Sequence, residues 1–287
     1  MLYIIVPVHN RLDKTKAFIR SLKQQFYSNY HLVIVNDGST DGTGAFIDNF
    51  KHELTVLQGD GNLWWGGGIN LALDYVHRYL TDDDYVAFAN NDIVLLGDTI
   101  SILLAECAKD RKALFHPLVL DQNGKAVSCG CKVRNWAFFL TNHPFRHQLI
   151  NSKMNYKNVS LDMMTARFLT FHSSLLNYVK RIDVSHFPQY AGDFDFCLMA
   201  RKRNYSCFLV PRSICTLDMA TSGINPNVIR SFNQFIGSLS SIRSTNNLKV
   251  RLAFALKHCC AILLVPHMAS TIIKIFLNYI RYSLLKR

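Results

Sequence analysis

In the first hundred residues, short apolar runs alternate with segments whose apolar residues recur at helical spacing, and this alternation restricts the fold most. The apolar runs are residues 2–6, 32–35, 54–57 and 85–89. Between the first two runs, Ile19, Leu22 and Phe26 recur at steps of three and four, as on an amphipathic helix. Buried strands alternating with helices predict an α/β fold with a mostly parallel central sheet and flanking helices.

The composition is typical of a folded protein in a reducing compartment. Hydrophobic residues make up 49% of the chain and charged residues 18%, which is too apolar for a disordered protein. The eight cysteines are irregularly spaced and form no Cys-x-x-Cys pair. The first ten residues contain no basic leader or cleavage site. We therefore expect free thiols and a cytoplasmic location.

Positive charge is concentrated at the C-terminal end. The formal net charge is +12, but Asp218 is the last acidic residue and nine Lys or Arg residues follow it. The middle of the chain, residues 110–160, has no clear period, so we expect a loop-rich insertion with some strands there. The charge asymmetry predicts two parts, an α/β domain over residues 1–227 and a basic tail over residues 228–287.

The tail is expected to form amphipathic helices. One apolar stripe comprises Leu248, Leu252, Ala255, Cys259 and Leu263. A second helix, after Pro266, has a polar face of Lys274, Asn278 and Arg281 opposite an apolar face of Ile272, Phe276 and Tyr279. The stretch 258–273 has no Asp, Glu, Lys or Arg, but it is shorter than the ~20 apolar residues that span a membrane. Helices that lie on a membrane surface are therefore favoured.

Two other interpretations of the basic tail are nucleic-acid binding through phosphates and a packed helical subdomain without a partner. The basic residues are interleaved with Leu, Ile, Phe and Cys, whereas an arm that binds nucleic acid is normally more polar. We therefore expect an anionic membrane surface, and no nucleic acid, as the partner of the tail.

Two turns near the expected strand ends are candidates for ligand binding, because the ligand crevice of a doubly wound sheet borders the carboxyl ends of its strands. Asp37, in NDGSTDGT (36–43), could accept hydrogen bonds from a base or ribose, or form an ordinary Asp-Gly turn. GDGNLWWGGGIN (59–70) places three glycines before a helix, whose N-terminus favours anions. Trp65 in this segment could stack on a base or sugar, or pack in the core.

Two further motifs carry carboxylates. Asp92, in ANNDI (89–93), could hold Mg²⁺ or Mn²⁺ together with substrate phosphates, or cap a helix. In YAGDFDFCLMARKRNY (190–205), Asp193 and Asp195 lie two residues apart, at the N-cap and in the first turn of a helix expected over about 194–203. The two side chains would point in different directions, so one could act as a base while the other is structural. Helix capping is the alternative for both.

The order and spacing of these motifs resemble the family 2 glycosyltransferases, which have the GT-A fold. The matching blocks are VPVHN (6–10), Gln24-Gln25, IVNDGSTDGT (34–43), GNLWWGGGIN (61–70), NND (90–92) and GDFDFCLMARKRNY (192–205). The resemblance covers residues 1 to about 222. The WWGGG variant is similar to the bacterial branch that includes rhamnosyltransferase-type enzymes.

The resemblance implies a role for each motif. Asp193 would be the catalytic general base that takes the proton of the acceptor hydroxyl. Asp92 would bind Mg²⁺ or Mn²⁺, a Lewis acid at the donor diphosphate. Asp37 would contact the nucleotide base in a pocket shaped by Pro7 and Asn10. The residues expected to bind the nucleotide sugar are Pro7, Asn10, Asp37, Gly38, Trp65, Gly67, Asn70, Asn91 and Arg167.

The chain departs from the family pattern around the metal and the base. Asn90 replaces the first acid of the Asp-x-Asp motif, and Gly192 stands where a Glu often precedes the base. The segment ICTLDMATSG (214–223) has no His, which leaves Asp218 as a second expected metal ligand. These departures keep open a non-catalytic membrane-associated scaffold with the same fold. A nucleotidyltransferase is a further alternative, although residues 7–20 lack a basic, Gly-rich motif for a triphosphate.

The function expected from the sequence is that of an inverting, metal-dependent hexosyltransferase. It would move a sugar from a UDP- or dTDP-sugar to a lipid-linked or polysaccharide acceptor during bacterial cell-surface glycan synthesis. The expected location is peripheral, at the cytoplasmic face of the inner membrane. The donor sugar, its base, the acceptor and the linkage are left open.

Overall fold

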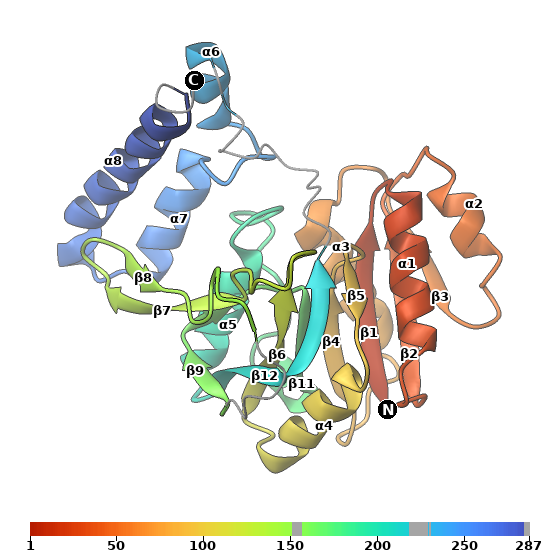
Figure 1. Ribbon diagram of the computed structural model, residues 1–287. Helices are drawn as coiled ribbons and strands as arrows, with labels where there is room; N and C mark the ends of the chain where they lie inside the picture. Colours follow the sequence, from red (N-terminus) through yellow and green to blue (C-terminus); the bar gives the residue numbers. More distant parts are fainter. Residues whose placement is uncertain (151–156, 218–228, 230, 284–287) are drawn as a thin grey trace.

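The structure is a computed structural model that describes residues 1–150, 157–217, 229 and 231–283 (Figure 1). Its main sheet has nine strands in the order β3-β2-β1-β4-β11-β6-β12-β5, with β9 paired to β12. These strands are β1 (Leu2–Val8), β2 (Tyr30–Asn36), β3 (Thr55–Gln58), β4 (Tyr85–Ala89), β5 (Ile93–Leu95), β6 (Ala113–Leu120), β9 (Val159–Leu161), β11 (Phe168–His172) and β12 (Ser206–Leu217). A small sheet consists of β10 (Met163–Met164), β7 (Gly130–Asn135) and β8 (Leu140–Asn142).

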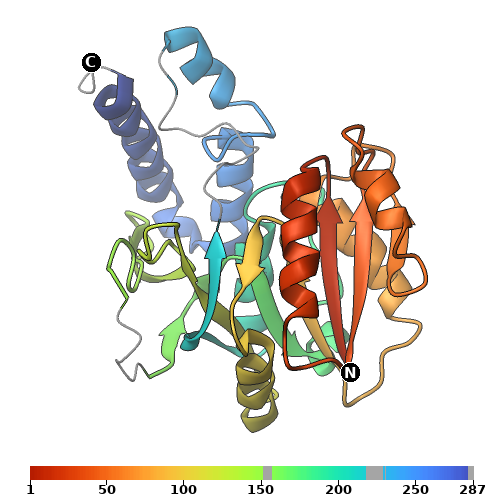
Figure 2. The same ribbon diagram turned by 45° about the vertical axis from the view of Figure 1, so that its right-hand side comes forward.

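One half of the main sheet confirms the α/β fold that the sequence predicts. Strands β3, β2, β1 and β4 pair in parallel and coincide with the four apolar runs. The side chains of Ile4, Ile5 and Val6 are fully buried, because helices cover both faces of this half (Figure 2). The covering helices are α1 (Leu12–Lys23), α2 (Thr43–Asp48) and α3 (Trp64–Val76), whereas α4 (Thr99–Lys109) packs against β6, β11 and β12 of the other half. The carboxyl ends of β1, β2 and β4 therefore meet at one edge of the sheet.

The other half of the sheet is mixed, and it contains one of the strands expected within residues 110–160, at a position that the sequence analysis does not assign. Strand β6 lies within the segment 110–160, yet seven of its eight residues are buried. The residues His116 and Pro117 interrupt the apolar pattern, which hides the strand in the sequence. Pro117 has no N–H for the ladder, and the partner strand β12 has a register shift between Val210 and Ile214, next to Pro117.

The C-terminal segment forms three helices, α6 (Phe232–Ser238), α7 (Leu248–His258) and α8 (Leu264–Ser283). Helices α7 and α8 lie side by side, close to the hairpin of β7 and β8 and away from the parallel half of the sheet (Figures 1 and 2). The sequence predicts two helices here, and α6 is an addition. Helix α8 begins at Leu264, ahead of Pro266, since proline is tolerated in a first helical turn. The expected domain boundary at 227/228 lies partly outside the described residues.

The faces of α7 and α8 differ from those predicted. On α7, the predicted stripe residue Ala255 is buried, but so is Phe254, which lies outside the stripe, whereas the stripe residue Leu252 is 42% exposed. On α8, the predicted polar residue Lys274 faces the protein and donates to the carbonyl oxygens of Phe138 (2.6 Å) and Phe139 (3.0 Å). Backbone carbonyls at the end of the β7–β8 hairpin thus attract the polar side of α8.

The outward faces of these helices are consequently apolar. The exposed apolar residues are Leu252, Leu256, Ile262, Val265, Ile272, Ile273, Phe276 and Leu277. Among the predicted apolar residues of α8, Tyr279 packs on Phe235 with the ring centroids 4.4 Å apart. By length and composition, the segment Ala261–Ser283 is long and apolar enough to cross a membrane, and 17% of its apolar window is buried in the protein.

Candidate active site

Two adjoining cavities lie where the polar turns of the sequence meet. The first has a volume of about 260 Å³ and the second about 500 Å³. The residues that line both are Arg11, Trp65, Asn90, Asp92 and Gln189. Asp37 lines the first cavity and Asp193 the second. The three aspartates that the sequence analysis selects therefore surround neighbouring cavities, with Asp92 at the wall between them.

Asp37 orders the loop beside the first cavity. Its side chain is buried, and Oδ1 accepts the backbone N–H groups of Gly61 (2.8 Å) and Leu63 (3.3 Å). Oδ2 accepts the N–H of Trp64 (3.1 Å). Gly38 follows with a φ of +67°, and a Cβ on it would lie 2.9 Å from the Cα of Gly61. The turn after β2 and the loop before α3 are thus packed closely together, and each holds the other in its conformation.

Pro7 and Asn10 have different positions relative to the first cavity. Pro7, in β1, lines it, whereas Asn10 lines neither cavity. The side-chain oxygen of Asn10 accepts the N–H of Thr40 (2.8 Å), and its own N–H donates to Ser39 (2.8 Å). Asn10 therefore joins the turn after β1 to the turn after β2 and acts on the pocket through that loop.

The glycine run at the start of α3 packs against protein, whereas the sequence suggests a close approach to a ligand. A Cβ on Gly68 would lie 2.8 Å from the Cβ of Pro7, and the N–H of Gly66 donates to the carbonyl of Pro188 (2.8 Å). Gly67 lines neither cavity. The glycines allow α3 to approach β1, and the direct binding role expected for Gly67 stays a prediction.

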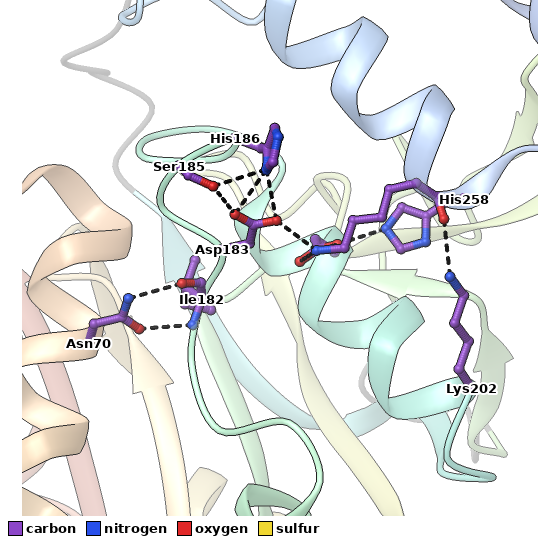
Figure 3. Close-up of polar contacts among 9 residues, drawn as sticks. Asn70, Ile182, Asp183, Ser185, His186, Lys202 and His258 are labelled. Carbon is purple, nitrogen blue, oxygen red and sulfur yellow. Dashed lines mark hydrogen bonds and ion pairs between the residues drawn. The ribbon is translucent and has the colours of Figure 1, made fainter.

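Asn70 is also a structural residue. Its Nδ2 donates to the carbonyl of Ile182 (2.9 Å), and its Oδ1 accepts the N–H of the same residue (2.8 Å; Figure 3). Its side chain is buried and lines neither cavity. Asn70 holds the segment that leads into α5 (Gly192–Arg201), and its expected role in binding the nucleotide sugar stays a prediction.

Trp65 combines the two roles that the sequence leaves open. It lines both cavities, and its ring meets the edge of buried Phe88. The indole N–H donates to Oδ1 of Asn90 (3.2 Å), and the backbone N–H donates to Oε1 of Gln189 (3.1 Å). The indole is therefore held by both core packing and hydrogen bonds at the boundary of the two cavities.

Asp92 has a carboxylate oxygen available for a cation. Oδ2 lies 3.5 Å from a guanidinium nitrogen of Arg11, while Oδ1 is buried without a hydrogen-bond partner among the described residues. The neighbouring Asn91 lines the first cavity and donates to the hydroxyl of Thr15 (2.9 Å). Hard divalent cations prefer carboxylate oxygens, so the unpartnered oxygen of Asp92 fits such an ion.

The protein supplies few other metal ligands. Within the described ranges, no group of three or more His, Cys, Asp or Glu side chains is placed to hold a metal ion. Asp218, the second expected ligand, lies outside the described residues. Mg²⁺ is often held by one or two carboxylates together with substrate phosphates, so a single carboxylate at this position is chemically sufficient on the protein side.

Asp193 lies in the first turn of α5, where the helix begins two residues earlier than predicted. Its Oδ1 accepts the N–H of Phe194 (2.9 Å), and its Oδ2 accepts the N–H of Ala166 (3.3 Å). Burial raises the pKa of Asp193 to about 6, whereas these hydrogen bonds and the charge of Arg167 lower it. A carboxylate with a pKa close to neutral pH is well suited to accept a proton.

Arg167 lines the second cavity and links two of the segments around it by hydrogen bonds to their backbone. One guanidinium nitrogen donates to the carbonyl of Ser128 (2.6 Å), and the carbonyl of Arg167 accepts the N–H of Asn90 (3.1 Å). The positive charge favours the ionised form of Asp193. Arg167 therefore lowers the pKa of Asp193 through its positive charge.

Asp195 points to the C-terminal helices and not to the cavities. Its buried carboxylate lies 2.7 Å from Nε2 of His258 and 2.9 Å from Nζ of Lys257 (Figure 3). Nζ of Lys257 is also 2.9 Å from Asp183, and Lys202 donates to the carbonyl of Lys257 (3.1 Å). This network fastens α7 to α5, two residues from Asp193.

Several cavity residues are not among those predicted from the sequence. Arg11, Gln189 and Arg243 line the first cavity. Arg11 directly follows the Pro-x-x-Asn turn, so its place in the sequence could have indicated that it lies beside the ligand cavity. The tail residues Val250, Arg251, Phe254, His267 and Thr271 line the second cavity. No local pattern distinguishes them from other residues of an amphipathic helix.

Comparison with known proteins identifies one family. The model of the family described as "Glycosyl transferase family 2" matches residues 3–172. The chain is also similar to the glycosyltransferase GlyA of Streptococcus pneumoniae serotype 4, with 28% identity over 103 residues. That match covers 35% of this chain and 14% of GlyA, so the chain corresponds to a small part of that relative.

Three solved structures share the fold at 11–15% sequence identity. GalNAc-T7 with UDP, GalNAc and Mn²⁺ has a TM-score of 0.61 and is matched over 99% of this chain and 58% of its own. The mannosyltransferase PcManGT of Pyrobaculum calidifontis, with GDP-Man and Mn²⁺, has a TM-score of 0.59 over 97% and 71%. TarS of S. aureus has a TM-score of 0.57 over 99% and 44%.

Proposed function

The chain belongs to glycosyl transferase family 2, and on this premise we propose that it transfers a sugar from a nucleotide diphosphate to an acceptor hydroxyl, with inversion. One observation carries the proposal. The cavity lined by Asp37 and Asp92 adjoins the cavity lined by Asp193, and five residues line both. A donor in the first cavity and an acceptor in the second would meet beside Asp92 and Trp65.

The first cavity suits the nucleotide diphosphate. Asp37 and the loop that it orders offer polar groups to a base, and the Trp64 and Trp65 indoles offer stacking surfaces. Arg11 and Arg243 line the same cavity and supply positive charge for a diphosphate. Asp92 would hold Mg²⁺ or Mn²⁺, which supplies Lewis-acid stabilisation of negative charge on the diphosphate.

Asp193 would accept the proton of the acceptor hydroxyl. The hydroxyl oxygen then forms a bond to the anomeric carbon while the bond between this carbon and the diphosphate oxygen breaks, and the nucleoside diphosphate leaves. A single displacement of this kind inverts the anomeric centre. Burial favours the protonated carboxyl, so the proton taken from the hydroxyl is stabilised on Asp193.

The donor is tested by thermal unfolding in the presence of UDP-, GDP- and dTDP-sugars, with and without Mn²⁺, because a bound ligand raises the melting temperature by mass action. The panel includes dTDP-rhamnose, the donor expected for the rhamnosyltransferase-type branch. Sugar transfer or donor hydrolysis is then measured for the wild type and for Asp193→Asn. Donor binding without turnover in the wild type would favour a scaffold, and undiminished transfer by Asp193→Asn would exclude this residue as the base.

We also propose that α7 and α8 rest on an anionic membrane at the cytoplasmic face, where the enzyme would extend a lipid-linked or polysaccharide acceptor. The exposed apolar faces of both helices support this, as do the exposed basic residues Lys249 and Arg281. A surface position is favoured over a spanning one, because His267, Ser270 and Lys274 bind backbone carbonyls of the β7–β8 region along about two turns of α8. A spanning helix would lose those contacts.

A further inference from the structure

The second cavity is built from two distant parts of the chain. The first turn of α5 contributes Asp193 and Phe194, and the C-terminal helices contribute a mixed polar and aromatic wall. This wall is fastened to the catalytic domain by the Asp195–Lys257–His258 contacts. The C-terminal helices are therefore part of the site, in addition to any role at a membrane.

Arg251 brings an unneutralised positive charge to this wall. Its Nε–H donates to the carbonyl of Thr245 (2.9 Å), but no carboxylate of the described residues lies within ion-pair distance of the guanidinium. Burial lowers the pKa of Arg251. Burial and, to a smaller extent, the charge of Arg251 lower the pKa of Lys274. Arg251 is partly buried, and a partly desolvated cation without a counter-charge is stabilised by a bound anion.

Two side chains of α8 line the cavity beside Arg251 with unused hydrogen-bonding capacity. The hydroxyl of Thr271 is buried, at 3% exposure of the residue, and has no partner among the described residues. His267 donates from Nδ1 to the carbonyl of Trp136 (2.7 Å), which leaves Nε2 to accept a hydrogen bond from a hydroxyl group. The aromatic residues Phe139 and Phe254 line the same cavity and suit the apolar face of a sugar.

From these contacts we propose that the second cavity binds an acceptor in which the reacting sugar adjoins a phosphate group. Arg251 and Thr271 bind the phosphate, and the sugar lies between Asp193 and the aromatic wall. The guanidinium fork matches phosphate oxygens in pairs, and the Thr271 hydroxyl adds a third donor. This proposal rests on the proposed transferase function and names the class of its acceptor.

The outer surface of α7 and α8 favours phosphate over a sugar carboxylate. Both helices expose apolar side chains on the side away from the protein, including Leu256 and Ile273. If that surface rests on a bilayer, the cavity lies about one helix diameter, roughly 10 Å, from the apolar boundary. The phosphate of a lipid-linked saccharide lies at that level.

The experiment uses the full chain saturated with Mn²⁺ and the nucleoside diphosphate that the donor panel identifies, so that the first cavity is filled. Dissociation constants are measured by calorimetry for inorganic phosphate, glucose 1-phosphate, N-acetylglucosamine 1-phosphate, the methyl glycosides of both sugars, and glucuronate. The variants are Arg251→Gln, Arg251→Lys and Thr271→Val. The matched control is Lys249→Gln, which removes the same charge from the exposed side of the same helix.

We expect phosphate-bearing probes to bind at least tenfold more tightly than neutral glycosides and glucuronate. Loss of a charge-assisted contact predicts a weakening of roughly 10- to 100-fold in Arg251→Gln. Arg251→Lys should be intermediate, Thr271→Val smaller, and Lys249→Gln within about twofold of the wild type, since its charge lies in solvent. Retained nucleotide binding by Arg251→Gln shows that this variant is folded.

Equal binding of phosphorylated and neutral probes, equal binding of glucuronate, or no phosphate binding at all would each overturn the proposal. Equal losses in Arg251→Gln and Lys249→Gln would overturn it as well. A failure to bind any nucleotide sugar would instead contradict the proposed function. A farnesyl ester of the tighter sugar phosphate, compared with the free sugar phosphate, distinguishes a lipid-linked source from a soluble one, and tight binding of either supports the proposal.

Discussion

Replacing Asp193 with Asn should stabilise the protein at neutral pH while it removes the base. In the folded protein, burial raises the pKa of this carboxyl from an ordinary value of 3.8 to about 6. Between these two values the folded protein binds more protons than the unfolded chain, so its stability falls as pH rises. Above pH 6 this loss of stability no longer increases with pH. The Asn side chain does not ionise, so the variant does not lose stability in this way.

The pKa difference of about two pH units corresponds to about 3 kcal/mol of unfolding free energy. Water in the cavity screens part of this charge, so we expect a cost of about 2 kcal/mol at pH 7.5 and about 1 kcal/mol at pH 5. At about 2–4 °C per kcal/mol, the melting temperature of Asp193→Asn relative to wild type should be about 3 °C higher at pH 7.5 than at pH 5. Any cost of the new amide near Ala166 cancels in this comparison.

The assay is calorimetric unfolding of both proteins at the two pH values, together with sugar transfer. Asp82→Asn is the control, because Asp82 is exposed and its replacement should give the same small difference at both pH values. A relative melting temperature of Asp193→Asn that is the same at both values, or higher at pH 5, would refute the claim that burial of this charge raises its pKa.

Arg167→Gln should move the acidic limb of the kcat/KM profile to higher pH, since the charge of Arg167 lowers the pKa of Asp193; an unchanged profile would contradict this. Asp195→Asn should lower the unfolding free energy by about 3 kcal/mol in urea titrations, because it leaves Lys257 without one buried partner, and a loss below 1 kcal/mol would argue against the network. Phe276→Glu should weaken sedimentation with phosphatidylglycerol vesicles, whereas an equally bound variant would show that α8 does not contact the bilayer.

The position of the polar turns could be predicted from the sequence because it follows from local rules. The apolar runs within β1, β2 and β4 require burial on both faces, and parallel strands bring their carboxyl ends to one edge. Asp37 and Asp92 follow two of those runs within three residues, so their convergence needed no knowledge of distant contacts. The family resemblance then selected Asp193 over Asp195 as the base, and the approach of Asp193 to the site depends on α5.

Roles that depend on distant partners could not be predicted. Asn70 and Gly67 belong to a motif that suggests ligand binding, yet the partner of Asn70 is the backbone of Ile182, 112 residues away. The position of strand β6 was hidden because Pro117 interrupts its apolar pattern, and its partner β12 has a register shift beside Pro117. Each case depends on a partner that no local window of sequence contains.

The sequence by itself determined the parallel half of the sheet, the three aspartates and the amphipathic, basic character of the tail, because periodicity and composition act over a few neighbouring residues. Only the tertiary structure decided which side of α7 and α8 faces the protein. The carbonyls of Phe138 and Phe139 hold Lys274, and Asp195 holds Lys257 and His258, so polar contacts turn the apolar faces outward and bring Arg251 and Thr271 to the second cavity. A truncation of residues 243–287 would therefore remove a wall of the site together with the expected membrane contact.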